Sequence, residues 1–221
     1  MLNKNKLSDI STKKIENGEL ENVIPEFYKL RTVVENTDWH NNQNVFDHTL
    51  NVMKELEKIF KLNFLKNKKL KVKITHILNS RIEKYSCKEL LFFAALMHDI
   101  AKTKTIQIID NNRTSCPEHE IKGSSKFEKI ASRFDLSKNE ISFIKEIIKT
   151  HGIPHITINI KKDKNTILKD FEEIKNQYPK VYLEIILLAM ADTLGSDLRK
   201  NLPDEFKFRI DIYKEILNSW I

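Results

Sequence analysis

The chain has 221 residues, which is enough for one buried core and does not require a division into two domains. Apolar residues make up 40% and charged residues 31%, as in ordinary globular proteins. Only four glycines and five prolines are present, which disfavours a fold of many short strands. We therefore expect an all-α fold.

The charge is modestly basic, with 38 Lys and Arg residues against 31 Asp and Glu residues, a formal net charge of +7. Much of this excess is lysine mixed with asparagine, as in residues 67–71, a pattern typical of a solvated surface. A basic field attracts phosphates and nucleic acid but specifies no partner. Charge alone therefore leaves RNA binding open.

Cysteine usage and hydropathy indicate a cytoplasmic protein. Cys87 and Cys116 are too few for a disulfide framework, and no C-x-x-C pair is present. The first twenty residues contain no apolar stretch of the kind that signals export. The longest unbroken apolar run, 90–97, falls far short of the roughly 20 residues that span a bilayer. We expect neither export nor membrane insertion.

The N-terminal third begins with a polar segment and continues with a helix. Residues 1–24 carry Asn, Lys, Ser and Glu with isolated leucines and isoleucines, and we expect a polar, partly ordered arm. A helix is predicted over about 47–62, with His48 in its first turn, because apolar residues recur there at helical spacing: Phe46, Leu50, Met53, Leu56, Ile59 and Phe60. The segment 62–85 is basic and irregular, fits either a helix or a ribbon, and is a candidate insertion.

The next three predicted helices each follow a capping-box spacing. Ser86 to Glu89 precedes the apolar run 90–97, which predicts a helix buried on all sides. The same spacing at Ser115 to Glu118 and at Ser137 to Glu140 precedes stretches of helical periodicity. The first of these helices would end at His98-Asp99.

The C-terminal third contains two further predicted helices. One runs from about 181 to 193, and the last begins near Pro203, a residue suited to the first turn of a helix. No repeat or flexible linker divides the chain. We therefore predict that residues 25–221 form a single domain.

Three of these helices direct chemistry-bearing residues towards the interior. His151 extends the apolar stripe of the helix after Ser137, Asp192 extends that of the helix over 181–193, and His98-Asp99 ends the most apolar helix. A carboxylate inside an apolar bundle costs several kcal/mol unless it is paired or bound to a metal. A lone buried histidine is more often a hydrogen-bonded core residue, but several of them with two carboxylates indicate a metal site.

The ordered series resembles a known family. His48, His98-Asp99, His119, His151 and Asp192 are similar to the H…HD…D pattern of the HD superfamily of metal-dependent phosphohydrolases, which has further histidines in members that hold two metals. The surrounding sequence resembles the HD domain of bacterial tRNA nucleotidyltransferases over about 38–209, in five stretches: 39–40, 45–50, 96–102, 119–123 and 191–196. The resemblance implies an HD-domain helical bundle with a mononuclear or dinuclear metal site in its core.

Two departures from the tRNA enzymes limit what the resemblance implies. No Gly-Ser followed by an Asp-x-Asp pair precedes the first motif, so we expect no polymerase activity. The stretch between His48 and His98 is longer and more basic than in those relatives, which leaves the identity of the substrate undetermined.

The family pattern implies a role for each matching residue. His48, His98, Asp99 and Asp192 would be ligands of one metal. His119 and His151 would hold a second, with Asp99 bridging. Two ions roughly 3.5–4 Å apart generate hydroxide at neutral pH and clamp the attacking and leaving oxygens of a phosphate ester. Imidazole and carboxylate ligands suit Mn, Fe, Ni, Co or Zn, and oxygen donors shift the preference towards Mn or Mg.

The other basic residues near these motifs are less informative. Lys102 matches a lysine that commonly follows the HD pair and would reach a phosphate oxygen, but a surface lysine at a helix end is the competing interpretation. His155 is predicted to turn away from the site because Gly152 and Pro154 break the helix. His40 and His76 receive no role.

Two functions are consistent with the sequence. The first is hydrolysis of phosphomonoesters or phosphodiesters of nucleotides, including 2',3'-cyclic nucleotides or RNA ends, with Asp99 and Lys102 as catalytic residues. The second is a non-catalytic module in which the metal is structural and the basic segment 61–73 binds RNA or a partner. The second predicts steep salt dependence of RNA binding. The sequence contains no pattern that indicates an oligomeric state.

Overall fold

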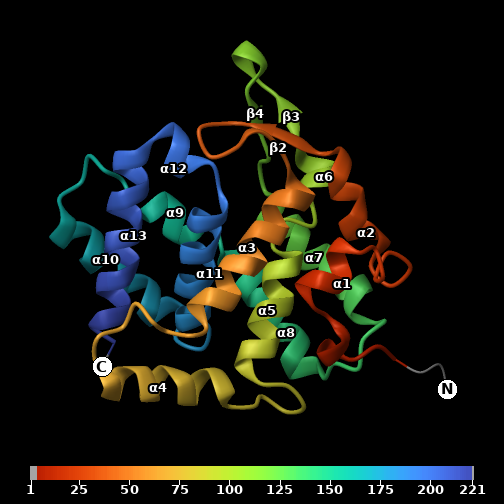
Figure 1. Ribbon diagram of the computed structural model, residues 1–221, viewed down its shortest axis with the longest axis horizontal. Coiled ribbons are helices and arrows are strands. Elements are labelled where there is room, and N and C mark those ends of the chain that lie inside the picture. The colour runs from red at the N-terminus through yellow and green to blue at the C-terminus, as the bar shows by residue number, and fades with distance from the viewer. Residues whose placement is uncertain (1–3, 221) are drawn as a thin grey trace.

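The computed structural model describes residues 4–220 and is built almost entirely of helices, as the sequence predicts (Figure 1). Three helices form its centre: α3 (Val45–Ile59), α5 (Cys87–Met97) and α11 (Tyr182–Gly195). Helices α7 (His119–Ala131) and α8 (Lys138–Thr150) cover one flank, and α10 (Lys164–Gln177) and α13 (Pro203–Asn218) cover the other. Short helical segments complete the chain: η1 (Leu7–Asp9), α1 (Thr12–Glu16), α2 (Pro25–Tyr28), η2 (Lys29–Thr32), α6 (Lys102–Thr105), η3 (Asp110–Asn112), α9 (Ile153–Thr157) and α12 (Leu198–Asn201).

Two of the three predicted capping boxes are present. Ser86 and Ser137 each accept a hydrogen bond from the backbone three residues on, and the glutamates there bond back to the cap. The predicted start at Ser115 is wrong, because this residue ends a strand and α7 begins only at His119. A cap at Ser115 would require Cys116 to be helical. Cys116 precedes Pro117, and a proline disfavours the helical conformation in the residue before it.

The central helices approach closely at Gly195. A Cβ atom at this position would lie 2.8 Å from the backbone nitrogen of Val52, so a larger residue would force α3 and α11 apart. Val52 lies one turn after His48, and Gly195 lies three residues after Asp192. The close packing therefore brings His48 and Asp192 to the same end of the bundle.

Two small antiparallel hairpins lie at this end of the bundle (Figure 1). They pair β1 (Val34–Asn36) with β2 (Asn41–Asn44), and β3 (Gln107–Ile108) with β4 (Thr114–Ser115). Arg113 joins them through two hydrogen bonds to Asp38, at 2.9 and 3.1 Å. No strand was predicted at these positions, because the four strands are too short to show alternation.

The N-terminal segment packs on the core, so the prediction of a partly ordered arm is wrong for residues 4–24. Leu7, Ile15 and Ile24 are buried, and Asn5 pairs with Phe134 in an isolated bridge. The few apolar residues of this segment are too widely spaced to show periodicity, yet they fill gaps on the central helices. Residues 1–3 of the predicted arm lie outside the described residues, and the division at residue 25 stays a prediction.

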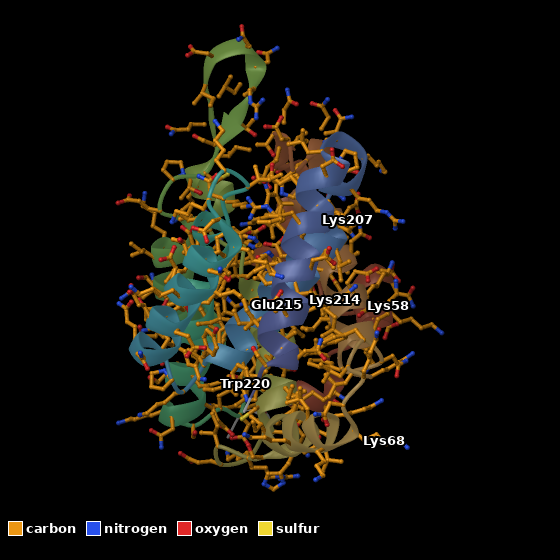
Figure 2. The ribbon with its side chains drawn as sticks, turned by 90° about the vertical axis from the view of Figure 1, so that its left-hand side faces the viewer. Lys58, Lys68, Lys207, Lys214, Glu215 and Trp220 are labelled. Carbon is orange, nitrogen blue, oxygen red and sulfur yellow. The ribbon has the colours of Figure 1, made fainter. Side chains whose placement is uncertain are left out.

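The basic segment 62–85 forms a helix, α4 (Lys68–Asn79), at the base of the bundle (Figure 1). Leu70, Ile74 and Leu78 are buried. The lysines of this segment are largely exposed. Figure 2 shows Lys58, Lys68, Lys207 and Lys214 at separate positions along one side. Among residues 4–220, no helix has the length and apolar character that a membrane crossing requires.

Candidate metal centre

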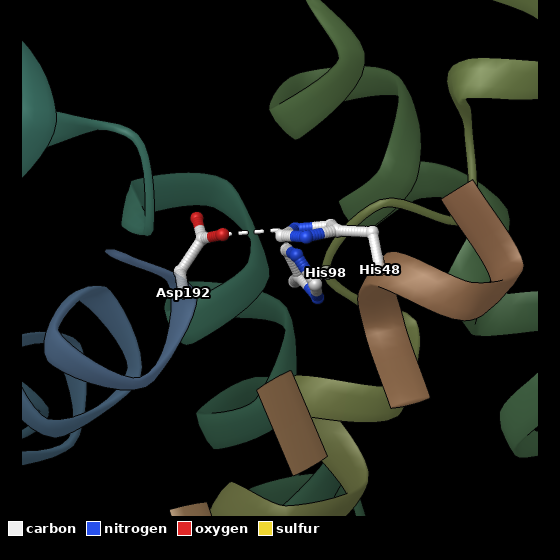
Figure 3. Close-up of side chains that lie close together, drawn as sticks. All are labelled: His48, His98 and Asp192. Atoms are coloured by element: carbon white, nitrogen blue, oxygen red, sulfur yellow. Dashed lines mark ion pairs between the residues drawn. The ribbon is translucent and has the colours of Figure 1, made fainter. Parts of the chain in front are cut away.

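The six predicted ligands converge at one end of the bundle from separate elements. His48 lies in the first turn of α3, His98 and Asp99 follow α5, and Asp192 lies in the last turn of α11. His119 begins α7 and His151 follows α8. Figure 3 shows His48, His98 and Asp192 pointing towards one another, with His48 Nε2 2.9 Å from Asp192 Oδ1.

Asp99 lies at the centre of this group. Its Oδ2 atom is 3.3 Å from His98 Nε2 and 3.9 Å from His48 Nε2. Its Oδ1 atom is 3.3 Å from His119 Nε2 and 3.8 Å from His151 Nε2. One carboxylate oxygen therefore faces each half of the site, which is the arrangement of a bridging carboxylate.

Three imidazole rings are oriented by the backbone. The Nδ1 atoms of His98, His119 and His151 lie 2.6, 2.8 and 2.7 Å from carbonyl oxygens three residues earlier in the chain. A carbonyl only accepts, so each Nδ1 must be the donor, and Nε2 is the ring nitrogen that faces the carboxylates. The Nε2 atoms of His119 and His151 face each other at 3.3 Å. Such rings are prepared to bind a cation.

The unsatisfied polar atoms in this group fit a metal ion. Among the described residues, buried side-chain atoms without a hydrogen-bond partner are His48 Nδ1, His98 Nε2 and both carboxylate oxygens of Asp99. Burying such atoms without a hydrogen-bond partner costs about 1–3 kcal/mol each, and the ammonium of Lys102, 2.9 Å from Asp99 Oδ2, offsets part of this cost for that oxygen. Two overlapping sets have donor atoms within 4.8 Å of one another: His48, His98 and Asp192, and His98, Asp99 and His151. The donor chemistry and the spacing both fit divalent ions.

The electrostatics keep both carboxylates ionised. Burial alone would raise the pKa of Asp99, but the cationic groups of His98 and Lys102 outweigh burial and hold it well below its usual range. Asp192 behaves in the same way, because hydrogen bonds from His155 and His48 outweigh its burial. The pKa of His98 rises to about 9, since the attraction of Asp99 exceeds the effect of burial. Ionised carboxylates therefore lie where the donor atoms meet.

Lys102 lies inside the site, so the interpretation of a surface lysine is wrong. Its Nζ atom is 2.9 Å from Asp99 Oδ2 and 2.9 Å from Glu35 Oε2. These carboxylates outweigh burial and raise the pKa of Lys102 above its usual value. Glu35 was not predicted, because it lies on a short strand outside the motifs.

Two further histidines belong to the surroundings of the site. His155 was predicted to turn away, but its Nε2 atom lies 2.9 Å from Asp192 Oδ2. Pro154 is the reason, because it lies in the first turn of the short helix α9 and does not end the helical path of the chain. The ring of His40 packs 4.3 Å from that of His48, and burial, then His48, lowers its pKa to about 4. His76 is exposed on α4, at the other end of the bundle.

A cavity of about 210 Å³ opens onto these groups. Its polar wall includes Asp99, Lys102, His119, His151 and Asp192, and its rim includes Trp39 and Ile156. A larger cleft of about 730 Å³ lies between the two hairpins and contains none of the predicted ligands. The chemistry of the donor atoms, and not the size of the cleft, identifies the candidate site.

The family comparison agrees with this site. A family model described as the HD domain matches residues 45–196, a range that includes all six predicted ligands and Lys102. Glu35, Trp39 and His40 precede the matched range. No curated protein matches the chain, and the narrower similarity to tRNA nucleotidyltransferases is not shown.

Proposed function

This chain belongs to the HD domain family, and we propose that it is a metal-dependent phosphohydrolase that cleaves phosphomonoesters or phosphodiesters of nucleotides. HD domains are typically metal-dependent phosphohydrolases. The proposal rests on the buried donor atoms around Asp99 that have no hydrogen-bond partner. The ammonium of Lys102 lies beside one of them, Asp99 Oδ2, and a metal ion would satisfy the others.

The donor set divides into two overlapping ion sites. In this proposal His48, His98, Asp99 and Asp192 hold one divalent ion, and His119 and His151 hold a second with Asp99 shared. Bound ions supply a nucleophile at neutral pH and stabilise charge on the phosphoryl oxygens. Mn, Fe, Ni, Co, Mg and Zn are all compatible with nitrogen and oxygen donors.

The protein's own groups bind and orient the ester. Lys102 has three N–H donors, and Asp99 and Glu35 occupy two directions around its ammonium. A third donor is left for a phosphoryl oxygen, so Lys102 would fix the phosphate and balance its growing charge. The carbonyls behind His98, His119 and His151 fix the ring orientations before substrate arrives.

The size of the cavity supports a substrate whose phosphate-bearing group is small. About 210 Å³ accommodates a terminal or cyclic phosphate with its sugar and excludes the interior of a folded RNA. Nucleotides, 2',3'-cyclic nucleotides and RNA ends are therefore the classes to assay first.

The test is metal analysis combined with hydrolysis of a chromogenic phosphodiester and a nucleotide panel, comparing wild type with Asp99→Ala. We expect near-stoichiometric metal in the wild type and loss of both metal and hydrolysis in the variant. His76→Ala is the matched control, since this histidine is exposed and distant. Metal-loaded protein that hydrolyses no ester in the panel would refute the proposal.

The alternative of an RNA-binding module rests on the basic segment 61–73. This segment follows the C-terminal end of α3, whereas His48 lies in its first turn, so about 16 Å of helix separates them. RNA bound there would lie away from the metal centre. Steep loss of RNA affinity with salt, removed by charge-neutralising changes at Lys68, Lys69 and Lys73, would support the alternative.

A further inference from the structure

The rim of the cavity differs in character from its floor. Of the lining residues, we call the carboxylates, Lys102 and the imidazoles the floor, and the apolar side chains of Trp39 and Ile156 the rim. The Ile156 side chain is 81% exposed, the largest value among the exposed apolar residues of the described chain. An aromatic and an aliphatic side chain at the mouth of a charged cavity form an apolar subsite beside it.

Trp39 is held rigidly at this rim. The guanidinium carbon of Arg209 lies over its ring at 4.9 Å, and the ring of His155 meets it edge-on at 4.9 Å. Its carbonyl accepts a hydrogen bond of 2.8 Å from the backbone of Asp197. Arg209 is itself fixed by Glu205 and by the carbonyl of His155. A fixed aromatic surface loses little entropy when a ligand packs on it.

The position of Trp39 relative to the floor matches the shape of a nucleotide. One imidazole, that of His155, separates Trp39 from the metal-binding floor, because it contacts the Trp39 ring and hydrogen bonds to Asp192. A ribose spans a comparable width between a phosphate and a base. With the phosphate against Lys102 and His119, the base would therefore reach the rim.

On the basis of the proposed function, we propose that Trp39 and Ile156 form the base-binding subsite of this enzyme and select nucleotides over phosphate esters that lack an aromatic group. Flat heterocycles pack between aromatic and apolar side chains whatever their hydrogen-bonding edges. The subsite therefore recognises the presence of a base. Trp39 lies on the N-terminal hairpin, before the range matched by the family model.

Tryptophan fluorescence provides a readout that does not depend on hydrolysis. The chain has two tryptophans, and Trp220 stacks on Tyr182 near the C-terminal end of α13, away from the site (Figure 2). Trp220→Phe leaves Trp39 as the sole tryptophan. We expect adenosine 5'-monophosphate to quench the metal-loaded variant saturably and ribose 5-phosphate to bind without quenching. Quenching of equal depth by both ligands would overturn the inference.

The affinity ratio of these two ligands tests Trp39 directly. By calorimetry, adenosine 5'-monophosphate should bind about 5- to 100-fold more tightly than ribose 5-phosphate. Trp39→Leu should bring the ratio close to one, and Trp39→Phe should restore most of it. A ratio that Trp39→Leu leaves intact, or equal loss of both affinities, would overturn the inference, since the latter indicates damage to the floor.

The same measurements separate this inference from the proposed function. Quenching and tight binding of adenosine 5'-monophosphate, with no hydrolysis of any ester in the panel, would support the subsite and refute the hydrolase. Hydrolysis of both esters with equal KM values would support the hydrolase and refute the subsite.

Discussion

Helix α11 buries a carboxylate near each of its ends, and the two carboxylates behave in opposite ways. Glu184 in the first turn is 3% exposed and Asp192 in the last turn is 8% exposed. Burial raises the pKa of Glu184 to about 7, and a backbone hydrogen bond in its own turn offsets this only in part. Hydrogen bonds from His155 and His48 outweigh the burial of Asp192 and hold its pKa well below the usual range.

The difference shows that burial by itself does not mark a functional carboxylate. A buried carboxyl group without a cationic partner is stabilised in its neutral form, whereas one that faces imidazoles stays ionised and can bind a metal. Glu184 therefore belongs to the packing of the bundle, and Asp192 belongs to the candidate metal centre. The following predictions test this contrast, from the largest effect to the smallest.

Asp192→Asn should lower metal affinity by more than about 100-fold, because it removes a charged ligand. Mutation of a residue that only hydrogen bonds to a ligand already lowers metal affinity about 10- to 100-fold. Elemental analysis and competition with a chelator measure the effect. Glu184→Gln is the matched control on the same helix and should keep its metal. Equal metal content in the two variants would contradict the distinction between the ends of α11.

Removal of the metal should destabilise the wild-type protein. A ligand present at 100 times its Kd adds about 2.7 kcal/mol to the free energy of unfolding, which corresponds to about 5–10 °C in Tm for a chain of this size. We expect a chelator to lower the Tm of the wild type by this amount and to leave that of Asp192→Asn nearly constant. Equal shifts in both proteins would place the stabilising ion elsewhere.

Glu184 should make the protein less stable as pH rises. The folded state holds this proton up to a pKa of about 7, whereas the ordinary value is 4.5, so ionisation favours the unfolded state between these pH values. The cost is complete above pH 7 and amounts to about 3 kcal/mol. Denaturant unfolding at pH 5 and pH 8 should show a smaller drop in Glu184→Gln than in wild type. The same drop in both proteins would refute this assignment.

His155→Gln should weaken metal binding about 10- to 100-fold, less than the loss of Asp192. His155 hydrogen bonds to Asp192 and its Nδ1 atom lies 3.3 Å from the Tyr213 hydroxyl, so it orients the carboxylate. Metal titration of this variant against His76→Ala measures the effect. Unchanged affinity would show that His48 alone suffices to hold Asp192.

The sequence predicted the central helices because their apolar residues recur at the helical period. It also predicted the capping boxes at Ser86 and Ser137, which are local hydrogen-bond patterns. The misplaced start at Ser115 has a local cause as well, since Pro117 restricts the residue before it. Segments of two to four residues, such as the hairpin strands, carry too little periodicity to be predicted.

The candidate site likewise contains residues that a sequence pattern predicted and residues that it did not. Asp99 ends an apolar helix and Asp192 continues an apolar face, and the resemblance of the ordered series to the HD pattern predicted that His48 joins them. Glu35, Trp39 and His155 gave no such signal, because their places depend on how the hairpin β1–β2 and helix α9 fold back over the bundle.

The sequence by itself determined the helical architecture, the family and the set of candidate donor residues, since these depend on periodicity and on ordered motifs. Only the tertiary structure decided which carboxylates are ionised, that Lys102 is buried between Asp99 and Glu35, and that Trp39 lies at the mouth of the site. Ionisation and subsite shape depend on distances between residues far apart in the chain, and no local pattern encodes such distances.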